Sequence, residues 1–277
     1  MTISVVIPTI GDRDIFPTIR SLNNSSIEIN EIIISAPYQN KLNKIELQKI
    51  QNLKIHISKL KGQVAQRIEG FKVAKGDIVV QLDDDIILAK DCLELLHKKI
   101  KTIPNIAISP NLIDRVSNRS IYKRKKGLKR FFFNQIMGIN KNEKVGRISM
   151  GGFETYPVID FESNELLSSD WLVGGCVMHH RKNLVLKSYF SFKGKAYCED
   201  LFHSIELKKR GLKLNLLPSA KAYLELNTPP PNFILFLKEL KNDYNIRKEF
   251  VKKNSLNYSK MLLGYLLIGL NFFLKNK

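Results

Sequence analysis

The sequence predicts an α/β fold in which a mostly parallel central sheet is flanked by helices. Short β-branched runs alternate with segments of helical periodicity, as in parallel sheets with right-handed crossovers. Residues 78–82 form a short, largely apolar run, as expected for a strand buried on both faces. The chain has 277 residues, 44% hydrophobic and 26% charged, which is enough for a substantial core in an ordinary globular protein.

The first half of the chain contains its expected elements in a regular order. Residues 3–7 form the first expected strand, which Pro8 and Thr9 end. Apolar residues at helical spacing predict helices at residues 14–22, 63–74 and 89–103. Further strands are expected at residues 31–34, 53–57, 78–82 and 106–109. The run at 53–57 is more amphipathic than the others, which favours a position near an edge of the sheet.

The second half is less regular before it returns to the same kinds of element. Residues 170–178 predict a loop that turns into a strand. A helix is expected at residues 201–211, because its last turn is basic and Gly211 provides a stop. Two further strands are expected, at residues 213–217 and 221–226.

Three consecutive aspartates, Asp83, Asp84 and Asp85, follow the strand at residues 78–82. Open α/β sheets bind ligands at the carboxyl ends of their strands. Side chains alternate along a strand, so Asp83 and Asp85 share a face if the strand extends that far. Such oxygen pairs suit Mg²⁺ or Mn²⁺, which would hold a diphosphate. The alternative is a solvated acidic turn in which Asp85 caps the next helix, and the aspartates alone favour neither.

Asp200 and the glycine pair Gly174–Gly175 are further candidates. Asp200 stands at the start of an expected helix, where it would be either an N-cap or a general base aimed into a cleft. The two glycines would allow close approach of the backbone to a ligand, although by themselves they favour an ordinary bulge. His179 and His180 are neighbours on a strand and are poor joint metal ligands. No GxGxxG or GxxxxGK[ST] motif supplies a phosphate site.

The formal net charge of +19 predicts attraction to an anionic partner. Residues 122–133 place six positive charges beside three phenylalanines. This segment suits a solvated basic loop, an anionic membrane or lipid-linked acceptor, or single-stranded nucleic acid. The cysteines at positions 92, 176 and 198 lack CxxC spacing, which argues against disulfides and structural zinc and for a reducing cytoplasm. The N-terminus starts with strand-like sequence, so no cleavable signal peptide is expected.

Three prolines at residues 229–231 precede a basic tail. We therefore expect one domain at residues 1–227 and an amphipathic helical tail at 228–277. Residues 261–274 are almost wholly apolar and would extend about 21 Å as a helix, which is shorter than the roughly 20 residues needed to span a bilayer. They would lie in the membrane plane as an anchor flanked by Lys260, Lys275 and Lys277, or else pack on the domain.

Taken together, these motifs resemble the family 2 glycosyltransferases, which are inverting enzymes of the GT-A (nucleotide-diphospho-sugar transferase) fold. The resemblance covers roughly residues 1–227, and it depends on the order and spacing of several short motifs. These are Ser4 to Thr9, Gln66-Arg67 with Gly70, Ala74, Gly76 and Asp77, the three aspartates, Gly174-Gly175, Glu199-Asp200 and Gly211. Residues 244–247 also look like a segment of members that build surface polysaccharides.

The resemblance implies a role for each matching residue. Asp83 would contact the ribose of the nucleotide, and Asp85, with Asp83, would bind a Mg²⁺ or Mn²⁺ ion under the diphosphate. Asp200 would be the catalytic base that deprotonates the acceptor hydroxyl. Glu199 would orient the acceptor or the helix. The remaining expected substrate-binding residues are Pro8 and Thr9 at the base pocket, Arg67 near the nucleotide, Asp84, Trp171, Gly174 and Gly175.

Two departures from the family weaken parts of this assignment. The second strand is followed by Ser35, Ala36 and Pro37 where the family has acidic residues that touch the base. The histidine that often completes the metal site is absent from residues 223–227, so the ion would depend on Asp85, diphosphate and water, with help from Glu225.

The expected function is transfer of a sugar from a nucleotide-sugar donor to a glycan or lipid-linked acceptor, with inversion, in cell-surface polysaccharide synthesis. We expect a cytoplasmic enzyme that is peripheral on the inner face of the cell membrane, attracted to an anionic membrane surface and not to nucleic acid. The alternatives are a nucleic-acid-binding protein, whose affinity would fall steeply with salt, and a catalytically degenerate homologue that binds membranes.

Overall fold

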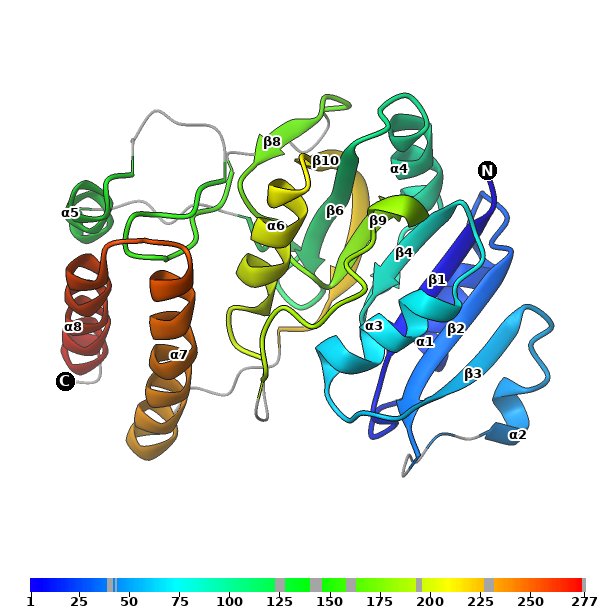
Figure 1. Ribbon diagram of the computed structural model, residues 1–277, viewed down its shortest axis with the longest axis horizontal. Helices are drawn as coiled ribbons and strands as arrows, with labels where there is room; N and C mark the ends of the chain where they lie inside the picture. The colour runs from blue at the N-terminus through cyan, green and yellow to red at the C-terminus, as the bar shows by residue number, and fades with distance from the viewer. Residues whose placement is uncertain are drawn as a thin grey trace. The chain divides into compact units, whose positions relative to one another are not determined.

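The computed structural model describes residues 1–38, 42, 44–122, 128–139, 146–157, 163–192, 196–226 and 232–275 (Figure 1). The chain divides into two compact units. Unit 1 contains residues 1–121 and 160–226, and unit 2 contains residues 122–159 and 227–277. Residues 122–159, which we expected within the first domain, therefore cluster with the tail.

Unit 1 is built on one sheet, in which the first four strands are parallel, as the sequence predicts. β1 (Ile3–Pro8) lies between β2 (Glu31–Pro37) and β4 (Ile78–Leu82), and β3 (Leu53–Ser58) pairs with β2 at the edge of the sheet. β1 and β2 are fully buried, which their largely apolar sequences predict.

The rest of the sheet is mixed, because antiparallel strands are added here to the mostly parallel sheet that the sequence predicts. β9 (Cys176–His180) lies between β4 and β6 (Ile106–Asp114) and is antiparallel to both. β10 (Lys213–Leu224) is parallel to β6, and the short strands β5 (Ile87–Leu88), β7 (Arg119–Ser120) and β8 (Leu167–Ser169) add antiparallel pairs. An apolar run does not encode strand direction, which depends on the connections.

β10 is a single strand where the sequence predicts two. Its pairing with β6 shifts register between Leu217 and Lys221. Pro218 stands within this shift and has no N–H to donate, so the irregularity accommodates it without ending the strand.

The helices of unit 1 cover the sheet, and their bounds are close to those expected except for the short helix Lys44–Leu47, which was not expected. They are α1 (Phe16–Asn23), α2 (Lys44–Leu47), α3 (Gln63–Val73), α4 (Cys92–Ile100) and α6 (Glu199–Lys209), with a 3₁₀ turn at Arg181–Asn183. α3 packs on β1 and β2, where Phe71 joins a core cluster with Val6 and Ile33. Gly70 allows this close packing, because a Cβ atom there would overlap the Val6 side chain. The packing fixes α3 beside the end of β4.

Unit 2 contains α5 (Leu128–Met137), α7 (Phe233–Lys253) and α8 (Tyr258–Lys275). The buried Arg247 of α7 donates to the Gly152 carbonyl and forms ion pairs with Glu154 and Asp243, which ties α7 to the preceding loop. Within the described residues, no helix is long and apolar enough to cross a membrane. Most of the expected basic segment (residues 123–127), the prolines at 229–231 and Lys277 lie outside the described residues.

Candidate active site

The three aspartates occupy the turn that follows β4. The strand ends at Leu82, and the backbone N–H of Asp83 donates to the carbonyl of Gly175 at 2.8 Å. The strand therefore does not extend to Asp85, and the condition under which alternation would place Asp83 and Asp85 on one face is not met. Asp85 does not cap the next helix either, because α4 begins at Cys92 and its N-cap is Asp91.

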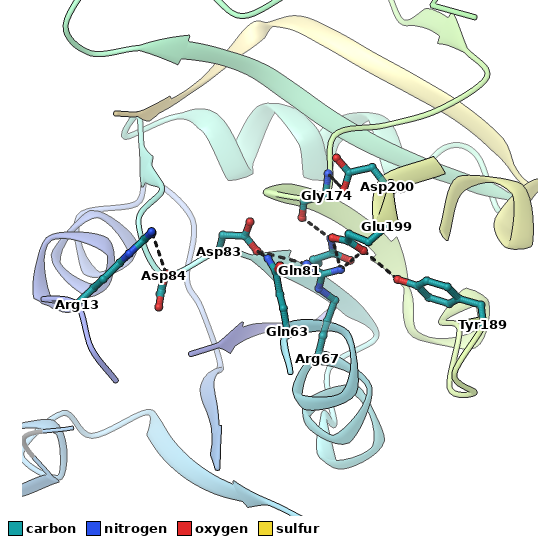
Figure 2. Close-up of polar contacts among 10 residues, drawn as sticks. All are labelled: Arg13, Gln63, Arg67, Gln81, Asp83, Asp84, Gly174, Tyr189, Glu199 and Asp200. Atoms are coloured by element: carbon teal, nitrogen blue, oxygen red, sulfur yellow. Dashed lines mark hydrogen bonds and ion pairs between the residues drawn. The ribbon is translucent and has the colours of Figure 1, made fainter. Parts of the chain in front are cut away.

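Asp83 is held from the side of α3. Its Oδ1 accepts from Gln63 Nε2 at 3.0 Å and from Arg67 at 3.4 Å (Figure 2). Burial raises the pKa of Asp83 to about 6, with Arg67 opposing this rise and Glu199 adding to it. Within the described residues its Oδ2 accepts no hydrogen bond, so this oxygen remains available to a ligand.

Asp84 and Asp85 bind groups from the end of β1 and the following loop. Asp84 Oδ2 accepts from the Thr9 hydroxyl at 2.5 Å, and burial raises the pKa of Asp84 despite this hydrogen bond. Asp85 is more exposed, with 45% of its side chain accessible, and forms an ion pair with Arg13. Since the Arg13 side chain is itself 59% exposed, this pair opens at small cost.

Pro8 and Thr9 lie at the end of β1, beside Ser35 of β2. The backbone N–H of Thr9 donates to the Ser35 carbonyl at 3.1 Å, and Gln66 Nε2 donates to the carbonyls of both Thr9 and Ser35. The Ser35 hydroxyl donates to the Gln66 carbonyl at 2.6 Å. Ser35 stands where the family that the sequence resembles has acidic residues. Its hydroxyl and carbonyl both bind Gln66, so Ser35 helps to hold α3 against the ends of β1 and β2.

Arg67 connects the aspartate turn to the start of α6. Its Nη1 lies 2.9 Å from both carboxylate oxygens of Glu199, and its side chain is 2% exposed. Burial lowers the pKa of Arg67, but the charges of Glu199 and Asp83 outweigh this and raise it. The Tyr189 hydroxyl donates to Glu199 Oε2 at 2.9 Å. Figure 2 shows Asp83 and Glu199 on either side of the same guanidinium group.

Asp200 is the second residue of α6 and does not cap it. The N-cap is Cys198, which has a left-handed backbone with φ of 57° and no side-chain capping bond. The Asp200 carboxylate instead accepts from the backbone N–H of Gly174 at 2.9 Å (Figure 2). Burial, followed by the negative charge of Glu199, raises the pKa of Asp200 well above its ordinary range.

Residues 4–160, more than half of the chain, match the family model described as glycosyl transferase family 2. The chain belongs to this family. No curated protein matches it in sequence. Its fold is that of GT-A glycosyltransferases, which similar solved structures share.

Three of these structures illustrate the likeness. A crystal structure of GalNAc-T7 with UDP, GalNAc and Mn²⁺ has a TM-score of 0.60 at 18% identity, over 90% of this chain and 48% of that one. TarS residues 1–349 from S. aureus with UDP-GlcNAc has a TM-score of 0.56 at 12% identity, over 94% and 69%. Mannosyltransferase PcManGT from Pyrobaculum calidifontis with GDP-Man and Mn²⁺ has a TM-score of 0.55 at 13% identity, over 95% of this chain and 68% of that one. The chain thus spans about half of GalNAc-T7.

In this family 2 chain, Gly174 precedes β9 and lies directly against the first two residues of α6. A Cβ atom at Gly174 would overlap Asp200 Oδ1 and lie 2.7 Å from Glu199 Oε1. Gln81 of β4 donates to the Gly174 carbonyl (Figure 2). At Gly175 a Cβ atom would meet only ordinary contacts, the nearest at 3.4 Å. Gly174 therefore leaves the space that the side chains of Glu199 and Asp200 occupy. The glycine pair by itself favours an ordinary bulge, so this role is visible only in the structure.

The carboxylates of Asp83 and Asp85 could supply some, but not all, of the ligands of a divalent cation. Within the described part of the chain, no group of three or more His, Cys, Asp or Glu side chains is arranged to hold a metal ion. Asp83 has an oxygen free of hydrogen bonds and Asp85 is accessible, so hard oxygen donors are present. Glu225 is exposed, just past the end of β10. A bound ion would need phosphate oxygens and water to complete its coordination.

Several site residues are not evident from the sequence. Gln63, Gln81, Tyr189 and Arg13 each bind an expected site residue or its neighbour, yet none belongs to a recognisable motif. Trp171, which we expected to bind substrate, is 6% exposed, and its carbonyl accepts from the Ser169 hydroxyl. His180 and His179 contact different helices: His180 lies 3.0 Å from the Ile100 carbonyl of α4, whereas His179 packs against Phe71 and His203.

Proposed function

We propose that this family 2 glycosyltransferase moves a sugar from a nucleotide-sugar donor to a glycan or lipid-linked acceptor, with inversion, in cell-surface polysaccharide synthesis. One observation supports this most directly. The carboxylates of Asp83 and Glu199 share the Arg67 guanidinium, and the base candidate Asp200, which follows Glu199 in the chain, accepts from the Gly174 N–H.

In the proposed reaction Asp200 accepts the proton of the acceptor hydroxyl. That oxygen forms a bond to the anomeric carbon as the bond from this carbon to the diphosphate oxygen breaks. A positioned base typically contributes about 10²–10⁴-fold. Glu199 is a positioning residue in this scheme, because Arg67 and Tyr189 already occupy its oxygens. The Gly174 N–H donates to Asp200 and so favours its charged form, which the proton transfer requires.

Asp83 and Asp85 would hold a Mg²⁺ or Mn²⁺ ion, and Thr9 and Asp84 would lie at the nucleotide. When bound, the ion would offset the charge that grows on the departing diphosphate. The Mn²⁺, UDP-sugar and GDP-sugar named for the similar structures support this choice of ligands. Since the ion pair of Asp85 with Arg13 is exposed, Asp85 would change partner without breaking a buried contact.

A thermal-shift screen of nucleoside diphosphates and their sugars, with and without Mn²⁺, tests this function. A ligand that binds the folded state raises the melting temperature by mass action. We expect at least one nucleotide to do so in a Mn²⁺-dependent way, and its sugar conjugate to be turned over with a glycan or lipid-linked acceptor. A complete lack of stabilisation by every nucleotide, together with no sugar transfer, would refute the proposal.

A further inference from the structure

Helix α8 is seated in unit 2 by one of its faces. Met261, Gly264 and Tyr265 lie on this face, and all three are buried. The rings of Tyr265 and Phe153 have centroids 5.5 Å apart. A Cβ atom at Gly264 would overlap the Phe153 ring and lie 2.9 Å from the terminal methyl of Met137. This packing fixes α8 along its side, so the opposite face is directed outward.

The outward face of α8 is also apolar. Leu262, Leu266, Leu270 and Phe273 recur at helical spacing and are 42%, 58%, 50% and 53% exposed. In the whole helix the only charged residues are Lys260 and Lys275, near its two ends. A helix on the surface of a soluble domain ordinarily places polar residues on this side. An exposed apolar stripe of this length indicates that something else covers it.

The beginning of α7 extends this stripe. Phe233, Ile234 and Leu237 are 48%, 78% and 44% exposed. Phe233 lies beside Phe273, with ring centroids 5.7 Å apart, so the start of α7 meets the end of α8, as the antiparallel pair in Figure 1 shows. We call the combined surface the hairpin face, which consists of Phe233, Ile234, Leu237, Leu262, Leu263, Leu266, Leu270, Phe273 and Leu274.

Lysines continue the same side of α7 beyond its apolar start. Lys241, Lys248 and Lys252 follow Leu237 at intervals of four, seven and four residues, which keeps them on one side of the helix. Within the described residues none of the three forms an ion pair with an acidic side chain. The hairpin face is therefore bordered by cations that are free to meet an anionic partner.

We propose that the hairpin face binds an anionic lipid bilayer, with its leucines and phenylalanines in the headgroup and acyl boundary and the α7 lysines at the phosphates. This arrangement is characteristic of interfacial helices, in which apolar burial and attraction to anionic lipids act together. A second copy of the chain is a poorer occupant, because pairing would bring together two lysine rows of proteins that each carry a formal charge of +19. The proposal goes beyond the transferase function, since no candidate catalytic residue takes part.

Vesicle co-sedimentation of the full chain tests this proposal. Vesicles of phosphatidylcholine with 30% phosphatidylglycerol are compared with pure phosphatidylcholine, at low and physiological salt. We expect binding to the anionic vesicles that weakens with salt. The variant Leu266→Gln/Leu270→Gln should lose about tenfold or more in partition coefficient, because each exposed leucine contributes on the order of a kcal/mol when buried. Lys241→Gln/Lys248→Gln should lose most of the preference for anionic vesicles.

Matched controls distinguish binding by the hairpin face from non-specific binding by exposed apolar residues. Val116→Gln and Leu60→Gln remove apolar side chains that are 73% and 60% exposed in unit 1, and they should bind like the wild type. Asp200→Asn should also bind normally, so a failed transferase assignment is distinguishable from a failed membrane assignment. Equal binding by the leucine variant, equal affinity for neutral vesicles, or a dimer in light scattering that the leucine variant dissociates would each overturn the proposal.

Discussion

Arg67 Nη1 lies 2.9 Å from both oxygens of Glu199, although the two residues are 132 positions apart. Both side chains are buried, at 2% and 8% exposure. Because the same guanidinium reaches Asp83, the arginine fixes the distance between the donor-side turn and the start of α6.

The first prediction concerns this buried pair. Arg67→Met leaves Glu199 as an unpaired buried charge, and removal of one partner of such a pair costs about 3–5 kcal/mol of unfolding free energy. In a double-mutant cycle, Arg67→Met/Glu199→Gln should be much less destabilised than the sum of the single variants. Urea denaturation measures the three changes. The exposed pair Lys98–Glu94 provides the control, and its cycle should show a far smaller coupling. Additive effects at Arg67 and Glu199 would contradict the assignment.

The second prediction is loss of transfer in Asp200→Asn. An asparagine keeps the shape of the side chain and still accepts from the Gly174 N–H, but it cannot take a proton. Turnover should fall about 10²–10⁴-fold, while the affinity for nucleoside diphosphate stays close to that of the wild type. Initial-rate assays and calorimetric titration measure the two quantities. Turnover equal to that of the wild type would reject Asp200 as the base.

The third prediction concerns the pH dependence that Asp200 produces. Its folded-state pKa is raised by burial and by Glu199, so the folded state binds the proton more tightly than the unfolded state. This contribution to stability is complete below the ordinary aspartate pKa of about 3.9 and is lost as the pH rises through the folded-state pKa. The melting temperature of the wild type should therefore fall relative to that of Asp200→Asn as the pH increases above the ordinary aspartate pKa.

The same shift should appear in the kinetics. A base works only when it is deprotonated. The pH below which the wild-type rate falls should therefore lie above the ordinary aspartate pKa range. Parallel pH profiles of melting temperature and rate measure both effects. A melting temperature difference between wild type and Asp200→Asn that does not vary with pH would contradict the assigned direction.

The fourth prediction separates the two neighbouring glycines. Gly174→Ala places a Cβ atom on Asp200 Oδ1, whereas Gly175→Ala creates only contacts of 3.4 Å or more. A displacement of about 1 Å in a reacting group can cost ~10²-fold, so Gly174→Ala should reduce turnover strongly and Gly175→Ala only mildly. Gly269→Ala is the control: no atom lies within 4 Å of its Cβ position, and alanine favours a helix interior. Similar turnover in both alanine variants would refute the steric argument.

The fifth prediction concerns the cation. Asp85→Ala should abolish the gain in nucleoside diphosphate affinity that Mn²⁺ provides, because it removes the accessible carboxylate of the pair. Arg13→Ala removes the present partner of Asp85 and should preserve or increase this gain. Calorimetric titration with Mn²⁺ or with EDTA measures both variants. An unchanged Mn²⁺ effect in Asp85→Ala would exclude this residue as a ligand.

The sequence predicts the parts of the fold that are set by local patterns. The bounds of α3 differ by one residue from the expected 63–74, and β4 ends where the three aspartates begin. The antiparallel direction of β9 is not predictable, because the residue pattern of a five-residue strand does not encode its direction. In the site, Asp200 and Gly174 are evident from their motifs, but the seating of one against the other depends on tertiary packing. Tyr189 belongs to no sequence motif, and its hydrogen bond to Glu199 is made across tertiary structure.

The position of β9 has a consequence for how the polypeptide is made. β9 fills the gap between β4 and β6, yet residues 176–180 emerge from the ribosome long after both of those strands. Until then β4 and β6 each present an open edge with unsatisfied backbone groups, which is a template for pairing between nascent chains. Fragments that stop before Cys176 should therefore aggregate, and chaperone demand during biosynthesis should peak while the polypeptide is about two thirds complete.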